Sequence, residues 1–98
     1  MEKNLPYYLD TPTDTAKRLA GRMRAIRKRK RITQKVLASR SNVSYATLRR
    51  FEKTGQISLE SFIKLSMELG VINEIHELFK EPVYNSIEEV LNDAPQNT

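Results

Sequence analysis

The stretch TQKVLASRSNVSYATLRRFEK, residues 33–53, decides the expected fold of this chain. Thr33 and Ser44 are residue types that cap helix N-termini, and each one precedes a segment with apolar residues at helical spacing. Asn42, between the two segments, tolerates the left-handed conformation that a tight turn requires. The stretch therefore predicts two short helices joined by a tight turn, the first of them over residues 34–40.

The second helix of this pair, which we expect to run to about Lys53, has two different faces. At about 100° per residue, Leu48 and Phe51 fall together on one side. The opposite side carries a small residue and three cations, Ala46, Arg49, Arg50 and Lys53. One face can therefore anchor the helix on a core, which leaves the other face free for an anionic partner.

The free face has the chemistry needed to read double-stranded DNA. A major groove about 12 Å wide admits a helix, and an arginine there can donate two hydrogen bonds to guanine. We expect Arg49 and Arg50 to read bases, while the small Ala46 lets the helix backbone approach the base edges. The helix N-termini at Gln34 and Ser44 offer amide groups to phosphates. These features predict a helix-turn-helix that binds DNA.

A long amphipathic helix is predicted upstream, beginning at Thr11. Thr11 is a capping residue, Pro12 suits the first helical position, and Asp14 completes a capping box. The apolar stripe of this helix consists of Ala16, Leu19, Ala20, Met23 and Ile26. Residues 1–10 show no helical period, so we expect an extended N-terminal arm there.

Further helices are predicted downstream. Ser58 caps a fourth helix that ends at Gly70, and its apolar positions are Leu59, Phe62, Ile63, Leu65, Met67 and Leu69. A fifth, short helix is expected over residues 73–80, and a capping box at Ser86 predicts another in the acidic C-terminal tail, residues 82–98.

The fold class expected from these elements is all-α, because no segment alternates with the period of a strand. We expect a compact bundle of about five helices, with the DNA-binding domain over residues 11–81. Within the first short helix, Val36 and Leu37 are expected to face inward, and Ala38 and Val43 to pack closely.

Charge is distributed unevenly along the chain, whose formal net charge is +5. Residues 1–56 hold 15 Lys and Arg against 4 Asp and Glu, whereas residues 57–98 hold 2 against 8. The run RKRKR at residues 27–31 is either a solvated helix end or, as we expect, a site that attracts a polyanion, because adjacent cations repel one another. The residues expected to hold the DNA backbone by charge are Arg27, Lys28, Arg31 and Lys53.

The composition argues against several other classes of protein. There is no cysteine and the one histidine is His76, so we expect no metal site and no cofactor. A chain of 98 residues without a catalytic motif is not expected to be an enzyme. No apolar run approaches the roughly 20 residues of a transmembrane helix, and we expect a cytoplasmic protein with no membrane partner.

Taken together, residues 19–71 resemble the lambda-repressor-like, or Xre-type, helix-turn-helix family. The resemblance rests on Ile32-Thr33-Gln34, Leu37-Ala38, Val43-Ser44, Leu48, Phe51-Glu52, Ser58-Leu59-Glu60 and the segment that ends at Gly70. It implies that Tyr45, Ala46 and Arg50 read bases, that Gln34 contacts backbone or base, and that Thr47 lies near phosphate. The family usually binds palindromic sites as a two-fold dimer, with half-sites about one helical turn apart.

The chain departs from the family pattern at two places. Asn42 stands where a turn glycine is common, and the loop at residues 54–57 is about one residue shorter than usual, which puts a loop contact to phosphate in doubt. The residues also leave open whether Tyr45 touches DNA or packs on the preceding helix.

A narrower resemblance links the chain to HipB-type antitoxins. It rests on LRRFE at residues 48–52, on Gly55, Ile57, Ser58 and Leu59, on Leu78-Phe79 and on IEEVL at residues 87–91. Such a relationship implies a toxin protein as a second partner. The sequence therefore predicts a homodimeric transcriptional repressor on a palindromic operator, with an antitoxin that autoregulates its operon as the alternative.

Overall fold

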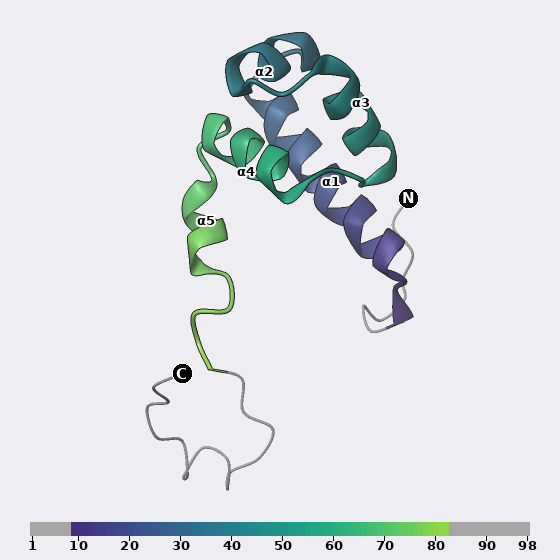
Figure 1. Ribbon diagram of the computed structural model, residues 1–98, viewed down its shortest axis with the longest axis vertical. Coiled ribbons are helices and arrows are strands. Elements are labelled where there is room, and N and C mark those ends of the chain that lie inside the picture. Colours follow the sequence, from purple (N-terminus) through teal and green to yellow (C-terminus); the bar gives the residue numbers. More distant parts are fainter. Residues whose placement is uncertain (1–8, 83–98) are drawn as a thin grey trace, which may run out of the picture.

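The computed structural model describes residues 9–82, and these contain five helices (Figure 1). They are α1 (Pro12–Arg29), α2 (Gln34–Ser41), α3 (Tyr45–Thr54), α4 (Leu59–Glu68) and α5 (Ile72–Glu77). No strand occurs among the described residues, which confirms the all-α fold class, and no helix there is long and apolar enough to cross a membrane. Most of the predicted arm and tail, including the capping box at Ser86, lies outside the described residues.

Each of the first four helices begins at a side chain that caps it. Thr11, Thr33, Ser44 and Ser58 each accept a hydrogen bond from the backbone N–H three residues ahead. The carboxylate of Asp14 also accepts from the Thr11 N–H at 3.1 Å, which completes the capping box. All four predicted helix starts are confirmed, because capping depends only on residues that are three positions apart.

Left-handed residues let the chain change direction after the helices. Asn42, at φ +57°, forms the predicted turn between α2 and α3, and Arg31 adopts the same φ after α1. Gly55 follows α3 at φ +81°, and a Cβ there would lie 2.6 Å from the carbonyl carbon of Ala16. Only glycine therefore allows the connection between α3 and α4 to cross so close to α1.

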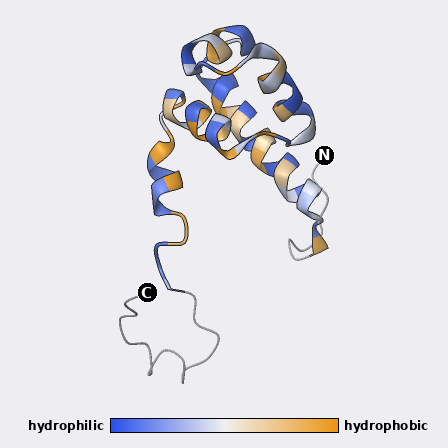
Figure 2. Ribbon diagram, viewed as in Figure 1, coloured by the Kyte–Doolittle hydropathy of each residue, from blue (hydrophilic) through white to orange (hydrophobic). Residues whose placement is uncertain are grey.

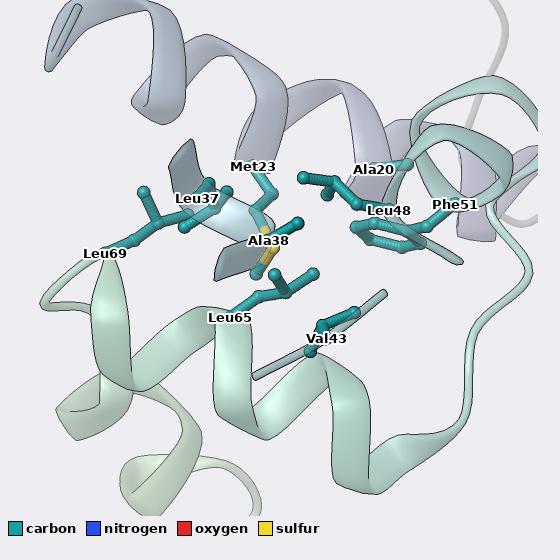
Figure 3. Packing of buried hydrophobic residues seen from close by; sticks show 9 residues of the cluster. All are labelled: Ala20, Met23, Leu37, Ala38, Val43, Leu48, Phe51, Leu65 and Leu69. Atoms are coloured by element: carbon teal, nitrogen blue, oxygen red, sulfur yellow. The ribbon is translucent and has the colours of Figure 1, made fainter. Parts of the chain in front are cut away.

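One hydrophobic core joins the first four helices (Figure 3). The ring of Phe51 on α3 meets Phe62 on α4 edge to face, with 5.8 Å between the centroids. The buried apolar residues are Ala20, Met23, Leu37, Ala38, Val43, Leu48, Phe51, Leu65 and Leu69. Each of them belongs to an apolar face or plug that the sequence predicts, so this part of the core is confirmed.

Val36, which was expected to face inward, is exposed, and so are three residues at the apolar positions of other predicted helices. Leu19 is 44% exposed, Val36 37%, Leu59 71% and Met67 62%. The inward orientation predicted for Val36 is wrong, and all four residues are exposed because a helix packed from one side buries only the strip that meets its neighbours. Met67, for example, follows Leu65 by two residues and is turned about 200° away from it around α4.

α5 stands apart from the other helices. Figure 1 shows it leading away from the end of α4, on the far side from α3, and it contains no buried residue. It ends at Glu77 and is shorter than the predicted 73–80, because Leu78 leaves the helical conformation and Phe79 takes φ +59°. Leu78 is 55% exposed and Phe79 90%, and Figure 2 shows hydrophobic residues along this projecting segment.

Candidate nucleic-acid interface

α3 is held from one side only. Leu48 and Phe51 are 0% and 2% exposed, and their side chains fill the core between α1 and α4 (Figure 3). The residues on the other side are all exposed, namely Ala46, Arg49, Arg50 and Lys53. The two-faced helix predicted from the sequence is therefore confirmed.

The free face of α3 contains an open hollow of about 380 Å³. Its lining consists of Ala46, Arg49, Arg50, Lys53 and Thr54. Ala46 fills little space between the longer side chains, and three of the other four residues are cations, so the hollow is positively charged. An edge of a base pair, flanked by phosphates, has the shape and charge that fit such a surface.

Tyr45 links the N-terminal ends of α2 and α3. The Nζ atom of Lys35 lies 5.5 Å from the centre of its ring, and so does the guanidinium carbon of Arg49. Both cations are thus within the range of cation–π attraction. Tyr45 therefore packs against a side chain of the preceding helix, while 38% of it stays exposed for another partner.

The two hydroxyl groups at the start of α3 bond to each other. Ser44 Oγ accepts from the backbone N–H of Thr47 at 3.0 Å and lies 2.7 Å from Thr47 Oγ1. This arrangement orients the first turn of α3. The first-turn amides that a helix cannot satisfy internally then face outward, where a phosphate can accept from them.

Arg50 is paired with Gln56, in the connection between α3 and α4. Arg50 Nη2 donates to Gln56 Oε1 at 2.5 Å. Both residues are exposed, so this hydrogen bond lies on the surface beside the hollow. The guanidinium of Arg50 therefore has a defined partner before any ligand is bound.

Glu52 is a buried hub between α1, α2 and α3. Its side chain is 5% exposed and accepts from Arg27 Nε at 2.8 Å and Arg27 Nη2 at 3.0 Å. Gln34 Nε2 donates to the same carboxylate at 2.9 Å, and Arg24 Nε lies 3.7 Å away. The partners of this carboxylate are nitrogen donors, and no group of metal-ligating side chains occurs in residues 9–82.

This hub corrects the expectation for Arg27. Arg27 is 8% exposed, and besides Glu52 it donates from Nη1 to the carbonyl oxygen of Ile32 at 2.8 Å. A guanidinium that is buried and bonded on several sides cannot also hold a DNA phosphate, so this prediction is wrong. Gln34 is half-buried and shares the hub, which ties the start of α2 to α3.

The other cations of residues 27–31 surround the end of α1. Lys28, Arg29, Lys30 and Arg31 are all exposed. Lys30 points toward the end of α4, because its Nζ lies 3.9 Å from where a Cβ on Gly70 would be. The run is therefore not a single surface turned toward the hollow, although its remaining cations are accessible.

From the sequence alone, no individual role was assigned to Arg24, Lys35 or Gln56, which lie at this surface, or to Glu52, which is buried beneath it. Lys35 could have been found, since it follows directly after a helix start that was expected to face phosphate. The ion pair between Glu52 and Arg27 joins residues 25 positions apart, and no local sequence pattern predicts it.

The model of the family HTH_3, described as helix-turn-helix, matches residues 23–71, which is half of the chain. The match begins within α1 and ends just after α4, so it contains α2, α3 and the core around them. No curated protein and no solved structure matches the chain significantly. The chain belongs to the HTH_3 helix-turn-helix family of lambda-repressor or Xre type, and is a DNA-binding helix-turn-helix regulator.

Proposed function

We propose that this regulator is a sequence-specific repressor that occupies a palindromic operator as a homodimer. The observation that carries the proposal is the positive hollow on α3, held in place by the buried Leu48 and Phe51. In the major groove, Arg49 and Arg50 read bases, Ala46 admits the base edges, and Tyr45 adds an aromatic contact. Genomic DNA as the partner also agrees with the cytoplasmic location that the sequence predicts.

A second set of residues positions the protein on the DNA backbone. Phosphate contacts fix the register of the protein on the duplex, whereas base contacts select the sequence. The starts of α2 and α3 supply amides and polar side chains, and exposed lysine and arginine side chains supply charge. The residues proposed for this role are Gln34, Ser44, Thr47, Lys53, Lys28 and Arg31.

The proposal of a homodimer rests on the projecting segment after α4. Leu78 and Phe79 are exposed, and Figure 1 places this segment on the opposite side of the molecule from α3. Acidic residues on it, Glu74, Glu77 and Glu81, repel DNA and keep this end away from the groove. Pairing two copies through this segment would leave both α3 faces free for half-sites roughly 34 Å apart.

Selection of bound sequences from a random duplex pool tests the whole proposal. We expect an enriched palindrome whose half-sites are separated by about one helical turn. Sedimentation of the complex with the selected duplex should give two chains for each duplex. Binding without sequence enrichment would contradict the role as a specific regulator, and one enriched half-site bound by one chain would contradict the homodimer.

The antitoxin is the second candidate, favoured by the 90% exposure of Phe79 on a segment that carries acidic residues. Such a segment could hold a toxin protein in addition to a sister subunit. The test uses three baits for partner proteins from the source cells: the full chain, its Phe79→Ser variant and a chain that ends at Glu81. An antitoxin should retain a partner that depends on Phe79 or on the residues after Glu81 and that changes operator binding. Absence of such a partner would argue against this candidate.

A further inference from the structure

Gln56 is an exposed residue whose side chain already forms a hydrogen bond with Arg50 when no DNA is bound. Its Oε1 accepts from Arg50 Nη2 at 2.5 Å, a short, charge-assisted hydrogen bond. An arginine on an exposed helix face otherwise samples many rotamers, and most of that freedom is lost when it binds. Contact with a fixed partner reduces this loss.

The loop that carries Gln56 is itself fixed on both sides. Gly55 passes so close to α1 that a Cβ would lie 2.6 Å from the carbonyl carbon of Ala16, and Ile57 packs against the hydrophobic core. The backbone N–H of Gln56 donates to Thr54 Oγ1 at 3.1 Å, and Thr54 Oγ1 donates to the Arg50 carbonyl oxygen at 2.7 Å. Gln56 is therefore tied back to the same turn of α3 that carries Arg50.

The hydrogen bond to Gln56 leaves Arg50 able to read a base. A guanidinium has five N–H donors, and Gln56 accepts one of the two on Nη2. The second N–H of Nη2 and those of Nη1 remain for the O6 and N7 atoms of guanine. Gln56 thus restricts the orientation of the guanidinium and leaves N–H groups of Arg50 available to donate to a base.

We propose that Gln56 is a specificity-determining residue, which holds Arg50 in the orientation that selects its base pair. This inference rests on the proposed function, in which Arg50 reads a base. Gln56 acts through Arg50 and is a positioning residue. Its effect is therefore on the choice between sequences rather than on attraction to DNA in general.

The test uses duplexes obtained by selection from a random pool with the native full-length chain. One duplex carries the preferred sequence, and the others each carry one altered base pair. The pair at which Arg50→Ala loses discrimination defines the position to study. For the native chain, Gln56→Ala, Arg50→Ala and the double variant, the dissociation constants of the preferred and altered duplexes give a discrimination ratio.

We expect Gln56→Ala to lower the discrimination ratio at that pair about three- to tenfold, the effect of one surface hydrogen bond. The double variant should discriminate no worse than Arg50→Ala alone, because Gln56 acts only through Arg50. Gln56→Glu keeps an acceptor for Arg50, so it should restore the ratio while its negative charge weakens binding to every duplex. Lys53→Ala is the matched control on the same face and should weaken both duplexes alike.

Two results would overturn the inference. An equal loss on all duplexes for Gln56→Ala would mean that Gln56 contacts the DNA backbone or only supports the loop. A double variant that discriminates less well than Arg50→Ala alone would mean that Gln56 acts independently of Arg50.

If the inference fails alone, Arg50→Ala still relaxes the sequence preference. If the proposed function itself fails, Arg50→Ala changes no preference. Thermal midpoints within about 2 °C of the native value show that the variants are folded.

Discussion

The free face of α3 and the segment around α5 are both exposed, but they are built in opposite ways. The inner face of α3 carries Leu48 and Phe51, which are almost fully buried, whereas α5 has no buried residue at all. The α3 face surrounds an alanine with three cations, and the segment after α5 presents Leu78 and Phe79. One surface is rigid and positive, and the other is apolar and weakly supported.

This contrast matches the demands of two kinds of partner. DNA offers donors and acceptors at set positions in its grooves, so the arginines that read it benefit from a helix that cannot shift. An apolar segment with few contacts of its own gains most of its burial only when a partner covers it.

The largest effect is expected from removing the buried carboxylate that supports α3. Glu52→Ala leaves Arg27 buried without its partner, so the free energy of unfolding should fall by about 3 to 5 kcal/mol. Glu77→Ala, on exposed α5, removes a surface pair with Lys80 and should change it by less than about 0.5 kcal/mol. Urea denaturation measures both variants. Equal losses would mean that the two regions are supported alike.

The next effect concerns the connection that crosses α1. Gly55→Ala introduces a Cβ 2.6 Å from Ala16 at a left-handed φ, and we expect a loss of about 2 to 3 kcal/mol in unfolding free energy. Gly70→Ala also has a left-handed φ, but its nearest neighbour is 3.9 Å away, so strain alone should cost about 1 kcal/mol. Thermal melts of the two variants compare them. A loss no larger at Gly55 than at Gly70 would show that the approach to α1 relaxes easily.

A third prediction separates base reading from backbone attraction. Arg50→Ala should reduce discrimination at one base pair by about 1 to 3 kcal/mol. Lys28→Ala should weaken binding to all duplexes alike and lower the slope of affinity against salt by about one charge. Titrations of matched duplexes at several salt concentrations measure both effects. An Arg50→Ala variant that loses affinity equally for every sequence would contradict its role as a base reader.

The smallest effect on the folded chain is expected at the apolar segment. Phe79→Ser changes a residue that is 90% exposed, so the unfolding free energy of the monomer should change by less than about 0.5 kcal/mol. Self-association, measured by sedimentation equilibrium, should weaken about tenfold if this ring anchors the dimer. Lys80→Ser is a neighbouring control that should leave association unchanged. Unaltered association in Phe79→Ser would place the dimer contact elsewhere.

Much of the fold and part of the candidate site are predictable from local sequence. The starts at Thr11, Thr33, Ser44 and Ser58 depend on hydrogen bonds over three residues, and the turn at Asn42 depends on one residue's conformation. The division of α3 into buried and exposed faces follows from its period alone. These features are local, so one sequence is enough to find them.

Other features depend on which helices come together. The sequence shows that Leu19 and Met67 are apolar residues within predicted helices. Their exposure depends on how far the neighbouring helices extend over them. The run of five cations predicts a site that attracts a polyanion, whereas in the folded chain Arg27 is buried against Glu52 and exposed Lys30 extends toward the end of α4. The number of charged residues can be counted from a sequence, but the direction in which each charged side chain extends depends on the fold.

The sequence by itself determined the all-α fold class, the starts of the first four helices, and that one helix presents Arg49 and Arg50 opposite an apolar anchor. Tertiary structure decided that Arg27 is buried in an ion pair with Glu52 and that Arg50 forms a hydrogen bond with Gln56. The physical reason is range. Caps and helical periods act over three or four residues, whereas a buried ion pair forms only when the fold brings together side chains 25 positions apart.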